Sequence, residues 1–257
     1  MSRWIRFRRG ITTAFGRLDE ETVQVHRGDM FAGAEPTGER VALADVELLA
    51  PCEPSKMLGM WRNFKALGAA MHLPDPVEPL YFIKAGTSFL APGGTIRRPR
   101  RFDGTVVFEG ELGIVIGREA SGVDEAEATR CIFGYTCVND VTGMEPLQDK
   151  VFPHWTRAKG FDTFGPFGPC IETEFDWRNA TVRTILNGTE RQNYRLDDMV
   201  MPPAELVSRI SFDMTLRPGD VIACGTSIGV GRLKPGCSIT IDIEGIGALT
   251  NTYVAES

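Results

Sequence analysis

The chain has 257 residues, 42% of them hydrophobic, which is enough to bury a full core, and its formal net charge is −6. A surface with this net charge repels a phosphate backbone, so the composition argues against nucleic acid as a partner. No apolar stretch approaches the length of a membrane span and no signal-type segment follows the basic start, so we expect no membrane partner and a cytoplasmic location.

Residues 1–54 are predicted to form a small N-terminal β subdomain, and residues 55–257 a larger domain. The run from residue 3 to residue 9 alternates basic with apolar side chains, which is typical of a half-buried strand, although a basic patch for nucleic acid or lipid is the alternative. Pro51-Cys52-Glu53-Pro54 then marks the boundary between the two parts.

The next stretch, residues 55–72, has helical character because Trp61, Phe64 and Leu67 recur near helical spacing. It stops at a proline-rich segment, residues 74–79, where a helix does not continue. We therefore predict a helix followed by a mobile loop.

Strand signals dominate the rest of the chain, and the predicted strands are 80–83, 106–116, 135–138, 182–186, 221–224 and 239–243. Two short helices are predicted, one capped by Asp124 and running toward Ile132, the other starting at Pro202-Pro203 and ending near Phe212. Many strands separated by turns, with few helices, predict a β-rich α+β fold and argue against a parallel doubly wound sheet.

Two smaller signals concern the cysteines and a glycosylation sequon. The six cysteines include no pair at metal-site spacing, so most are expected to be reduced core residues. Asn187-Gly188-Thr189 matches the sequon, but Asn-Gly is also a typical hairpin turn, and we favour the turn in a cytosolic chain.

Two carboxylates stand in the otherwise apolar stretch 106–116. In a strand, Glu109 and Glu111 point to the same face about 7 Å apart, and their repulsion and lost hydration need a compensating cation or proton. A third acid, Asp140, ends the strand-like stretch 135–140, and three oxygen ligands favour Mg²⁺ or Mn²⁺, or else Ca²⁺, over zinc. The alternative, of equal weight on spacing alone, is a solvated strand face with Asp140 capping a helix or turn.

Two further segments carry groups that could act on an anion. Lys159 could neutralise a substrate anion beside a metal, or be an ordinary solvated lysine. Residues 225–229 match the Gly-x-Ser-x-Gly nucleophile elbow, but a strand follows and the last histidine is His154, so we reject a serine hydrolase. Gly225 and Thr226 are better explained as backbone N–H groups and a hydroxyl that bind a carboxylate or oxyanion.

Several motifs occur in the order found in the fumarylacetoacetate hydrolase superfamily, which the chain resembles over nearly all its length beyond about residue 55. They are Glu109-Gly110-Glu111-Leu112, Gly134-Tyr135-Thr136, Asn139-Asp140-Val141-Thr142, Lys159-Gly160-Phe161-Asp162, Gly165-Pro166, Asn187-Gly188, Arg191-Gln192, Pro218-Gly219-Asp220, Gly225-Thr226, Gly229-Val230-Gly231 and Glu244-Gly245-Ile246-Gly247. The resemblance implies a mixed β-sandwich roll of the type of that family's C-terminal domain, usually dimeric, with Mg²⁺ or Mn²⁺ on Glu109, Glu111 and Asp140.

The resemblance also implies a function for residues 55–257 as a catalytic domain. Members of the family cleave, decarboxylate or isomerise small oxo acids, often late in aromatic catabolism, and the metal stabilises the developing enolate as a Lewis acid. By the same resemblance Lys159 is expected to be catalytic. The expected substrate-binding residues are Asn63, Gln148, Gly225 and Thr226.

The chain departs from the family at two places. Many members carry Asn-Tyr-x-x-His-x-x-Glu in a lid, but here Leu67 and Ala70 occupy the His and Glu positions and neither can exchange a proton. His72 or Glu78 could take over, although His72 could equally be a surface residue at a helix end. Residues 142–145 lack the arginine and aspartate that often follow the threonine, so a distal substrate carboxylate is bound differently or is missing.

We therefore expect a homodimeric, metal-dependent enzyme and keep three hypotheses. The first is hydrolysis of a C–C bond in a 2,4-dioxo acid of the acylpyruvate or fumarylpyruvate type, with water or a repositioned lid base supplying the nucleophile. The second is an isomerase or decarboxylase of an unsaturated oxo dicarboxylic acid, which needs no activated water. The third is a catalytically idle metal-binding protein that holds an oxo acid or serves as an assembly partner.

Overall fold

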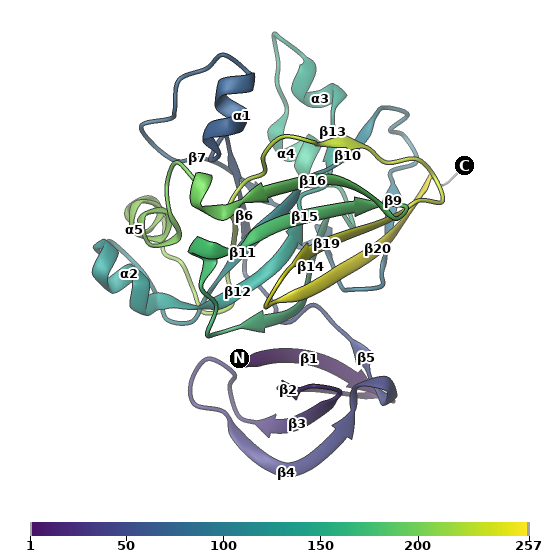
Figure 1. Cartoon of the computed structure of the whole chain (residues 1–257), viewed down its shortest axis with the longest axis vertical. Helices are drawn as coiled ribbons and strands as arrows, with labels where there is room; N and C mark the ends of the chain where they lie inside the picture. The colour runs from purple at the N-terminus through teal and green to yellow at the C-terminus, as the bar shows by residue number, and fades with distance from the viewer. Residues whose placement is uncertain (1, 256–257) are drawn as a thin grey trace.

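The computed structural model describes residues 2–255, and its N-terminal strands form the lower group in Figure 1. These strands are β1 (Arg3–Arg9), β2 (Thr12–Asp19), β3 (Thr22–Arg27), β4 (Glu35–Ala42) and β5 (Glu47–Leu48). The strand prediction for residues 3–9 is confirmed, since β1 pairs with β2 and buries Ile5 and Phe7. β1 also pairs with β14 (Gly165–Glu172), which joins this group to the large sheet. The division into two domains stays a prediction.

The large sheet continues from β14 through the middle of the molecule. Its further strands are, in order, β12 (Ile132–Asn139), β11 (Gly110–Ile116), β17 (Val221–Ala223), β6 (Met57–Trp61) and β7 (Leu80–Lys84). β11 is antiparallel to both of its neighbours, and all its residues are buried. A strand buried on both faces has a nearly continuous apolar sequence, which explains the run of apolar residues around the two glutamates.

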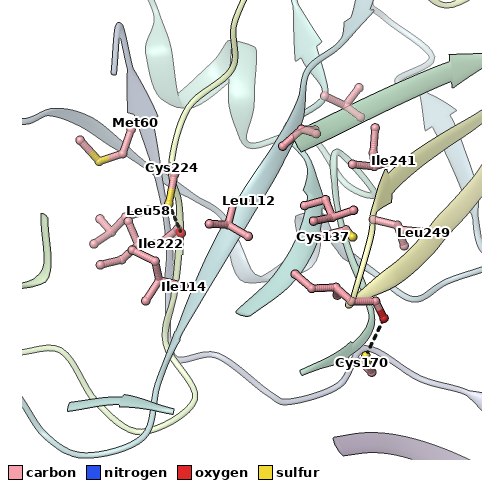
Figure 2. Close-up of a cluster of buried hydrophobic side chains, with 14 of the residues drawn as sticks. Leu58, Met60, Leu112, Ile114, Cys137, Cys170, Ile222, Cys224, Ile241 and Leu249 are labelled. Atoms are coloured by element: carbon pink, nitrogen blue, oxygen red, sulfur yellow. Dashed lines mark hydrogen bonds between the residues drawn. The ribbon is translucent and has the colours of Figure 1, made fainter. Parts of the chain in front are cut away.

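A second sheet lies across the first (Figure 1) and consists of β16 (Thr189–Arg195), β15 (Thr181–Leu186), β19 (Ser238–Ile243), β20 (Gly247–Ala255) and β9 (Thr95–Arg98). Figure 2 shows the core between the sheets, where Leu112 and Cys137 face Ile241 and Leu249. The short strands β13 (Thr142–Gly143), β10 (Val106–Phe108) and β18 (Gly231–Arg232) form a third sheet, and β8 (Phe89–Leu90) pairs with β14. The predicted β-rich α+β fold, a mixed β-sandwich roll, is confirmed.

The helices of the described chain are short: α1 (Lys65–Ala70), α2 (Glu125–Cys131), α3 (Glu145–Gln148), α4 (Trp155–Lys159) and α5 (Pro203–Asp213). Single 3₁₀ turns occur at Leu43–Asp45, Gly86–Ser88, Trp177–Asn179 and Leu196–Asp198. The predictions of α2 and α5 are confirmed, and the Asp124 carboxylate caps α2 by accepting the Glu127 N–H at 2.8 Å. Within residues 2–255, none of the helices has the length and apolar character needed to cross a membrane.

The helix predicted for residues 55–72 is wrong in its first half. Met57–Trp61 is strand β6, parallel to β17 and antiparallel to β7, and only Lys65–Ala70 is helical. The apolar spacing matched a helix because β6 is buried on both faces, so its side chains show no two-residue alternation. Strand β6 needs a glycine at position 59, because a Cβ there would lie 2.3 Å from the Phe82 ring, which is too close for any side chain.

Two local predictions are confirmed. Asn187 and Gly188 connect β15 to β16 with positive φ angles of 50° and 77°, as a hairpin turn of type I′ requires. All six cysteines are buried and free.

Candidate metal centre

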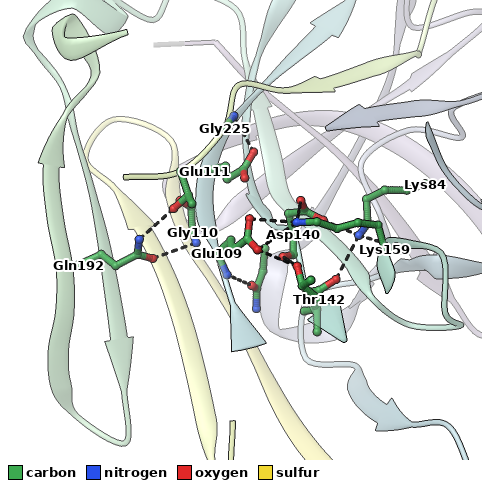
Figure 3. Close-up of polar contacts among 12 residues, drawn as sticks. Lys84, Glu109, Gly110, Glu111, Asp140, Thr142, Lys159, Gln192 and Gly225 are labelled. Carbon is green, nitrogen blue, oxygen red and sulfur yellow. Dashed lines mark hydrogen bonds and ion pairs between the residues drawn. The ribbon is translucent and has the colours of Figure 1, made fainter. Parts of the chain in front are cut away.

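Three carboxylates meet where β10, β11 and β12 come together (Figure 3). Glu109 separates β10 from β11, Glu111 is the second residue of β11, and Asp140 directly follows β12. In the register of these strands Gly110 lies opposite Asn139, and the Asp140 N–H donates to the Glu109 carbonyl at 2.9 Å. Each of the three acids offers one oxygen, and these oxygens all lie within 4.8 Å of one another. The fold thus brings together the acids that the sequence analysis selected.

These acids are buried, which contradicts the alternative of a solvated strand face. Glu111 and Asp140 are fully buried, and the Glu109 side chain is 17% exposed. Burial, followed by the charge of Asp140, raises the pKa of both Glu109 and Glu111. Burial also opposes the ionisation of Asp140, but the ammonium groups of Lys159 and Lys84 hold its pKa below the usual value. A cation would relieve the repulsion within the cluster.

One carboxylate oxygen of the cluster has no partner. Glu111 Oε2 accepts the Gly225 N–H at 2.8 Å, whereas Glu111 Oε1 is buried without any hydrogen-bond donor among residues 2–255. An unsatisfied buried acceptor costs about 1–3 kcal/mol, and more when it is charged. Three carboxylates that each offer one oxygen are the kind of ligands that Mg²⁺ and Mn²⁺ prefer. The residues present therefore fit a divalent cation.

Lys159, the last residue of α4, is buried against the acids and is not a solvated lysine. Its Nζ donates to Asp140 Oδ2 at 2.5 Å and to both Glu109 carboxylate oxygens at 3.0 Å. The same Nζ lies 4.8 Å from the centre of the Phe82 ring. Burial opposes protonation, but the acids outweigh it and raise the pKa of Lys159. Its contacts with three carboxylate oxygens thus favour the protonated form of Lys159.

Lys84 of β7 is a second buried cation, and the sequence analysis missed it. Its Nζ donates to Asp140 Oδ1 and to the carbonyls of Lys159, at 2.7 Å, and Val141, at 3.3 Å. Burial lowers the pKa of Lys84, with Asp140 acting in the opposite direction. The available signal was strand alternation, because Lys84 shares its face of β7 with buried Phe82 and therefore points inward.

A hydrogen-bonded frame holds Gly110, the residue between the two glutamates. Gln192 accepts the Gly110 N–H with Oε1 at 3.0 Å and donates from Nε2 to Thr226 Oγ1 at 2.9 Å. The Gly110 carbonyl accepts from the Thr226 hydroxyl at 3.0 Å and from the Tyr194 hydroxyl at 2.6 Å. The Thr226 hydroxyl, expected to bind substrate, is therefore engaged in positioning the metal-site backbone.

Gly225 and Asn63 also make bonds within the protein. The Gly225 N–H, expected to be open to an oxyanion, is instead bonded to Glu111. The Asn63 amide donates to the carbonyls of Met201, at 3.1 Å, and Cys224, at 3.0 Å, and its Oδ1 accepts the Met201 N–H at 2.9 Å. Asn63 thereby fixes the chain between the end of β17 and Gly225, and both hydrogens of its amide are used within the protein.

A cavity of about 160 Å³ opens onto Glu109 and Lys159. Its lining is mostly apolar and comprises Met60, Trp61, Arg62, Leu67, Glu109, Met144, Leu147, Trp155, Lys159, Thr226 and Val230. Leu67 thus occupies the wall where the family's histidine was expected, and Ala70 is exposed. His72 and Gln148 are also exposed and do not contribute to the lining.

A larger groove of about 580 Å³ runs along β7 and shares Trp61 and Trp155 with the cavity. Its lining contains no acid, lysine or histidine. The groups suited to chemistry therefore belong to the smaller cavity.

Two protein-family models match the chain. The model "Fumarylacetoacetate (FAA) hydrolase C-terminal" matches residues 56–254, and the model "Rv2993c-like, N-terminal" matches residues 2–51. The first of these models alone spans well over half of the chain.

Similar proteins extend over most of the chain. Protein Rv2993c of Mycobacterium tuberculosis is 43% identical, over 85% of this chain and 82% of that protein. The crystal structure of 2-hydroxyhepta-2,4-diene-1,7-dioate isomerase from Mycobacterium marinum superposes with a TM-score of 0.91 at 37% identity, covering 100% of both chains. Maleylpyruvate hydrolase from Sphingobium sp. SYK-6, in complex with manganese(II) and pyruvate, has a TM-score of 0.80 at 25% identity, covering 99% of this chain and 100% of that one.

Proposed function

We propose, because the chain belongs to the fumarylacetoacetate hydrolase family, that it is a divalent-metal-dependent enzyme that forms the enolate of a small 2-oxo acid. The observation that carries the proposal is the buried cluster of three acids with a partnerless oxygen on Glu111. When bound, Mg²⁺ or Mn²⁺ supplies Lewis-acid stabilisation of the developing enolate. The manganese in the maleylpyruvate hydrolase structure supports the choice of metal. The acids, Lys159 and the Gly225-Thr226 segment, retained together, argue against a catalytically idle metal-binding protein.

The chain's own residues have definite tasks in this proposal. Lys159 keeps its proton because the acids raise its pKa, so it neutralises an anionic oxygen of the substrate. Thr226 and Gln192 hold the Gly110 backbone and so keep the two glutamates in place. Most of the lining is apolar, and a less polar surrounding strengthens each electrostatic contact with the substrate.

Isomerisation or decarboxylation is the reaction that the geometry supports best. Among the residues that line the cavity, there is no histidine, and the carboxylate of Glu109 belongs to the metal cluster. Leu67 cannot exchange a proton, so the lining lacks the acid–base dyad that activates water in many members of the family. Decarboxylation and isomerisation need an enolate but no activated water. Isomerisation also needs a proton taken from one substrate atom and delivered to another, which requires a group from outside the lining. The similarity to the Mycobacterium marinum isomerase supports this class.

Hydrolysis of a C–C bond in a 2,4-dioxo acid, of the acylpyruvate or fumarylpyruvate type, is the second candidate. The similarity to maleylpyruvate hydrolase favours it. It requires a base from outside the lining, such as His72. From the family we also carry over, as part of the proposal, a role in aromatic catabolism, a cytoplasmic location and a homodimer.

A substrate panel tests the proposal. Purified protein with Mg²⁺ or Mn²⁺ is incubated with oxaloacetate, an unsaturated 2-oxo dicarboxylic acid, acylpyruvates and fumarylpyruvate, and the products are identified. Release of CO₂, or a shifted double bond without cleavage, supports the first candidate, and pyruvate plus a free acid supports the second, to be followed by His72→Ala.

Asp140→Asn is the test variant and Asp45→Asn, at an exposed position in the N-terminal region, is its matched control. We expect the Asp140 variant to lose turnover by at least about 100-fold, since even indirect disturbance of a metal ligand costs 10–100-fold. Turnover and metal binding unchanged by Asp140→Asn would contradict the proposal.

A further inference from the structure

Arg62 is a buried arginine that directly follows β6 and contributes to the lining of the cavity. It is 4% exposed, and its backbone has a φ of +66°, in the left-handed region that an arginine rarely adopts. Such a conformation persists only where the surroundings impose it, and it is concentrated at ligand sites. Arg62 therefore needs an explanation beyond packing.

The guanidinium of Arg62 is held by the loop that follows α1. Its Nη2 donates to the carbonyls of Pro74, at 2.7 Å, and Leu73, at 3.2 Å. Gly68 leaves room for it, since a Cβ at that position would lie 2.7 Å from Nη2. The Nε of Arg62 is buried and has no hydrogen-bond acceptor in the described part of the chain. The side chain is thus fixed in place through Nη2, while its buried Nε–H stays unused.

The charge of Arg62 is also unmatched. Over residues 2–255 it forms no ion pair, whereas Lys159, the other cation of the lining, is paired with Glu109 and Asp140. Asp75 Oδ1 also faces Gly68, but Asp75 is exposed and makes no ion pair with Arg62. A buried guanidinium without a counter-charge is unfavourable, and a carboxylate matches its planar set of donors.

We propose that Arg62 binds a second carboxylate of the substrate, so that the enzyme selects 2-oxo dicarboxylic acids. This inference rests on the proposed function, in which the 2-oxo acid end meets the metal centre and Lys159. Arg62 is then the cation left on the cavity lining for another anionic group, and apolar residues such as Met60 and Met144 receive the carbon chain between the two ends.

The test compares two non-reacting probes of equal length, 2-oxoglutarate and 2-oxopentanoate, which differ in a terminal carboxylate or methyl group. Each is titrated calorimetrically into the full-length, Mn²⁺-loaded protein. We expect the wild type to bind 2-oxoglutarate at least about tenfold more tightly, equivalent to about 1.4 kcal/mol. In Arg62→Met we expect this preference to fall to within about twofold, while 2-oxopentanoate affinity is kept.

Lys65→Met is the matched control, because it removes the same charge from the exposed face of α1. It should retain the full preference for the dicarboxylate, and Arg62→Lys should retain part of it. If Arg62→Met does not fold, as judged by thermal unfolding, Gly68→Ala replaces it, since the added methyl group displaces the guanidinium without removing its charge.

Two results would overturn the inference while leaving the proposed function standing. One is a wild-type protein that binds 2-oxopentanoate as tightly as 2-oxoglutarate, and the other is a dicarboxylate preference that persists in Arg62→Met and Gly68→Ala. Loaded protein that binds neither probe would contradict the proposed function itself, and the inference would fall with it.

Discussion

The metal centre and the entrance segment, residues 62–79, line the same cavity but are constructed differently. In the metal centre the acids and lysines are buried and tied to neighbouring strands by several hydrogen bonds. The entrance segment consists of a six-residue helix and a loop, and it exposes apolar side chains at Met71, Leu73 and Val77. Paired strands thus hold the acids of the metal centre, while the entrance segment beyond Asn63 is a short helix and a loop with exposed side chains.

The largest effect should come from breaking the buried charge network of the metal centre. Lys84→Met removes one of the two cations on Asp140 and leaves that carboxylate less well compensated. Loss of one partner of a buried pair costs about 3–5 kcal/mol, to be measured by urea unfolding of the metal-free protein. The exposed control Lys65→Met should be nearly neutral. A loss below about 1 kcal/mol in the Lys84 variant would mean that this network is not structurally important.

A smaller effect is expected from Gly110→Ala. A Cβ on Gly110 would lie 2.1 Å from Thr184 Oγ1 and 3.0 Å from Ile241 Cδ1, so the backbone between the two glutamates must move. We expect a destabilisation of about 1–3 kcal/mol together with weaker Mn²⁺ binding. Gly86→Ala is the control, because nothing lies within 4 Å of the position of its Cβ. Unchanged Mn²⁺ affinity in the Gly110 variant would show that the frame around this residue does not position the acids.

The metal centre should also respond to pH. Burial raises the pKa of Glu109 and Glu111 in the folded, metal-free protein. As the pH rises above the ordinary carboxyl range and toward these raised pKa values, the two acids therefore lower the stability of the folded state. Asp140, whose pKa is lowered, acts in the opposite sense and loses its contribution when the pH falls through its folded value. A cation binds the ionised forms, so the increase in Tm caused by Mn²⁺ should be larger at pH 8 than at pH 5.5. An increase that is equal or larger at pH 5.5 would contradict this picture.

The smallest effect on stability is expected in the entrance segment. Leu67 is half-buried and Ala70 is exposed, so Leu67→His with Ala70→Glu should change the free energy of unfolding by only about 0.5 kcal/mol. The pair would nevertheless restore the family's His and Glu positions, with the histidine on the cavity lining, and we expect a gain in hydrolysis of acylpyruvates, measured by pyruvate release. Ala70→Glu alone is the control. A large loss of stability would show that the entrance is as tightly constructed as the metal centre.

The sequence predicts the cluster of three acids well because its signal is local. Two acids two residues apart in an apolar stretch, with Asp140 at the end of the next strand, are recognisable without knowing the pairing of strands. The partners of these acids are less visible, since Lys84 is brought to Asp140 from 56 residues away by strand order alone.

The entrance is harder to predict for the same reason. The apolar spacing of residues 55–72 matched a helix because the burial of β6 on both faces hides its strand period. The substrate-binding role of Asn63 stays a prediction, and the sequence did not show that its amide donates to the carbonyls of Met201 and Cys224, which are distant in sequence. The sequence gives no sign of the role proposed for Arg62. That role depends on the absence of an ion-pair partner, which only the folded structure reveals.

The most direct test of the account is a calorimetric titration of Mn²⁺ into the metal-free wild type, Glu111→Gln and the exposed control Glu21→Gln. Glu111→Gln keeps the shape of the side chain but removes the charge of the carboxylate that has an unused oxygen. We predict one ion per chain in the wild type and control, and affinity at least about tenfold weaker in Glu111→Gln, equivalent to about 1.4 kcal/mol. Absence of Mn²⁺ binding to the wild type, or equal affinity in Glu111→Gln, would contradict a metal centre at these three acids.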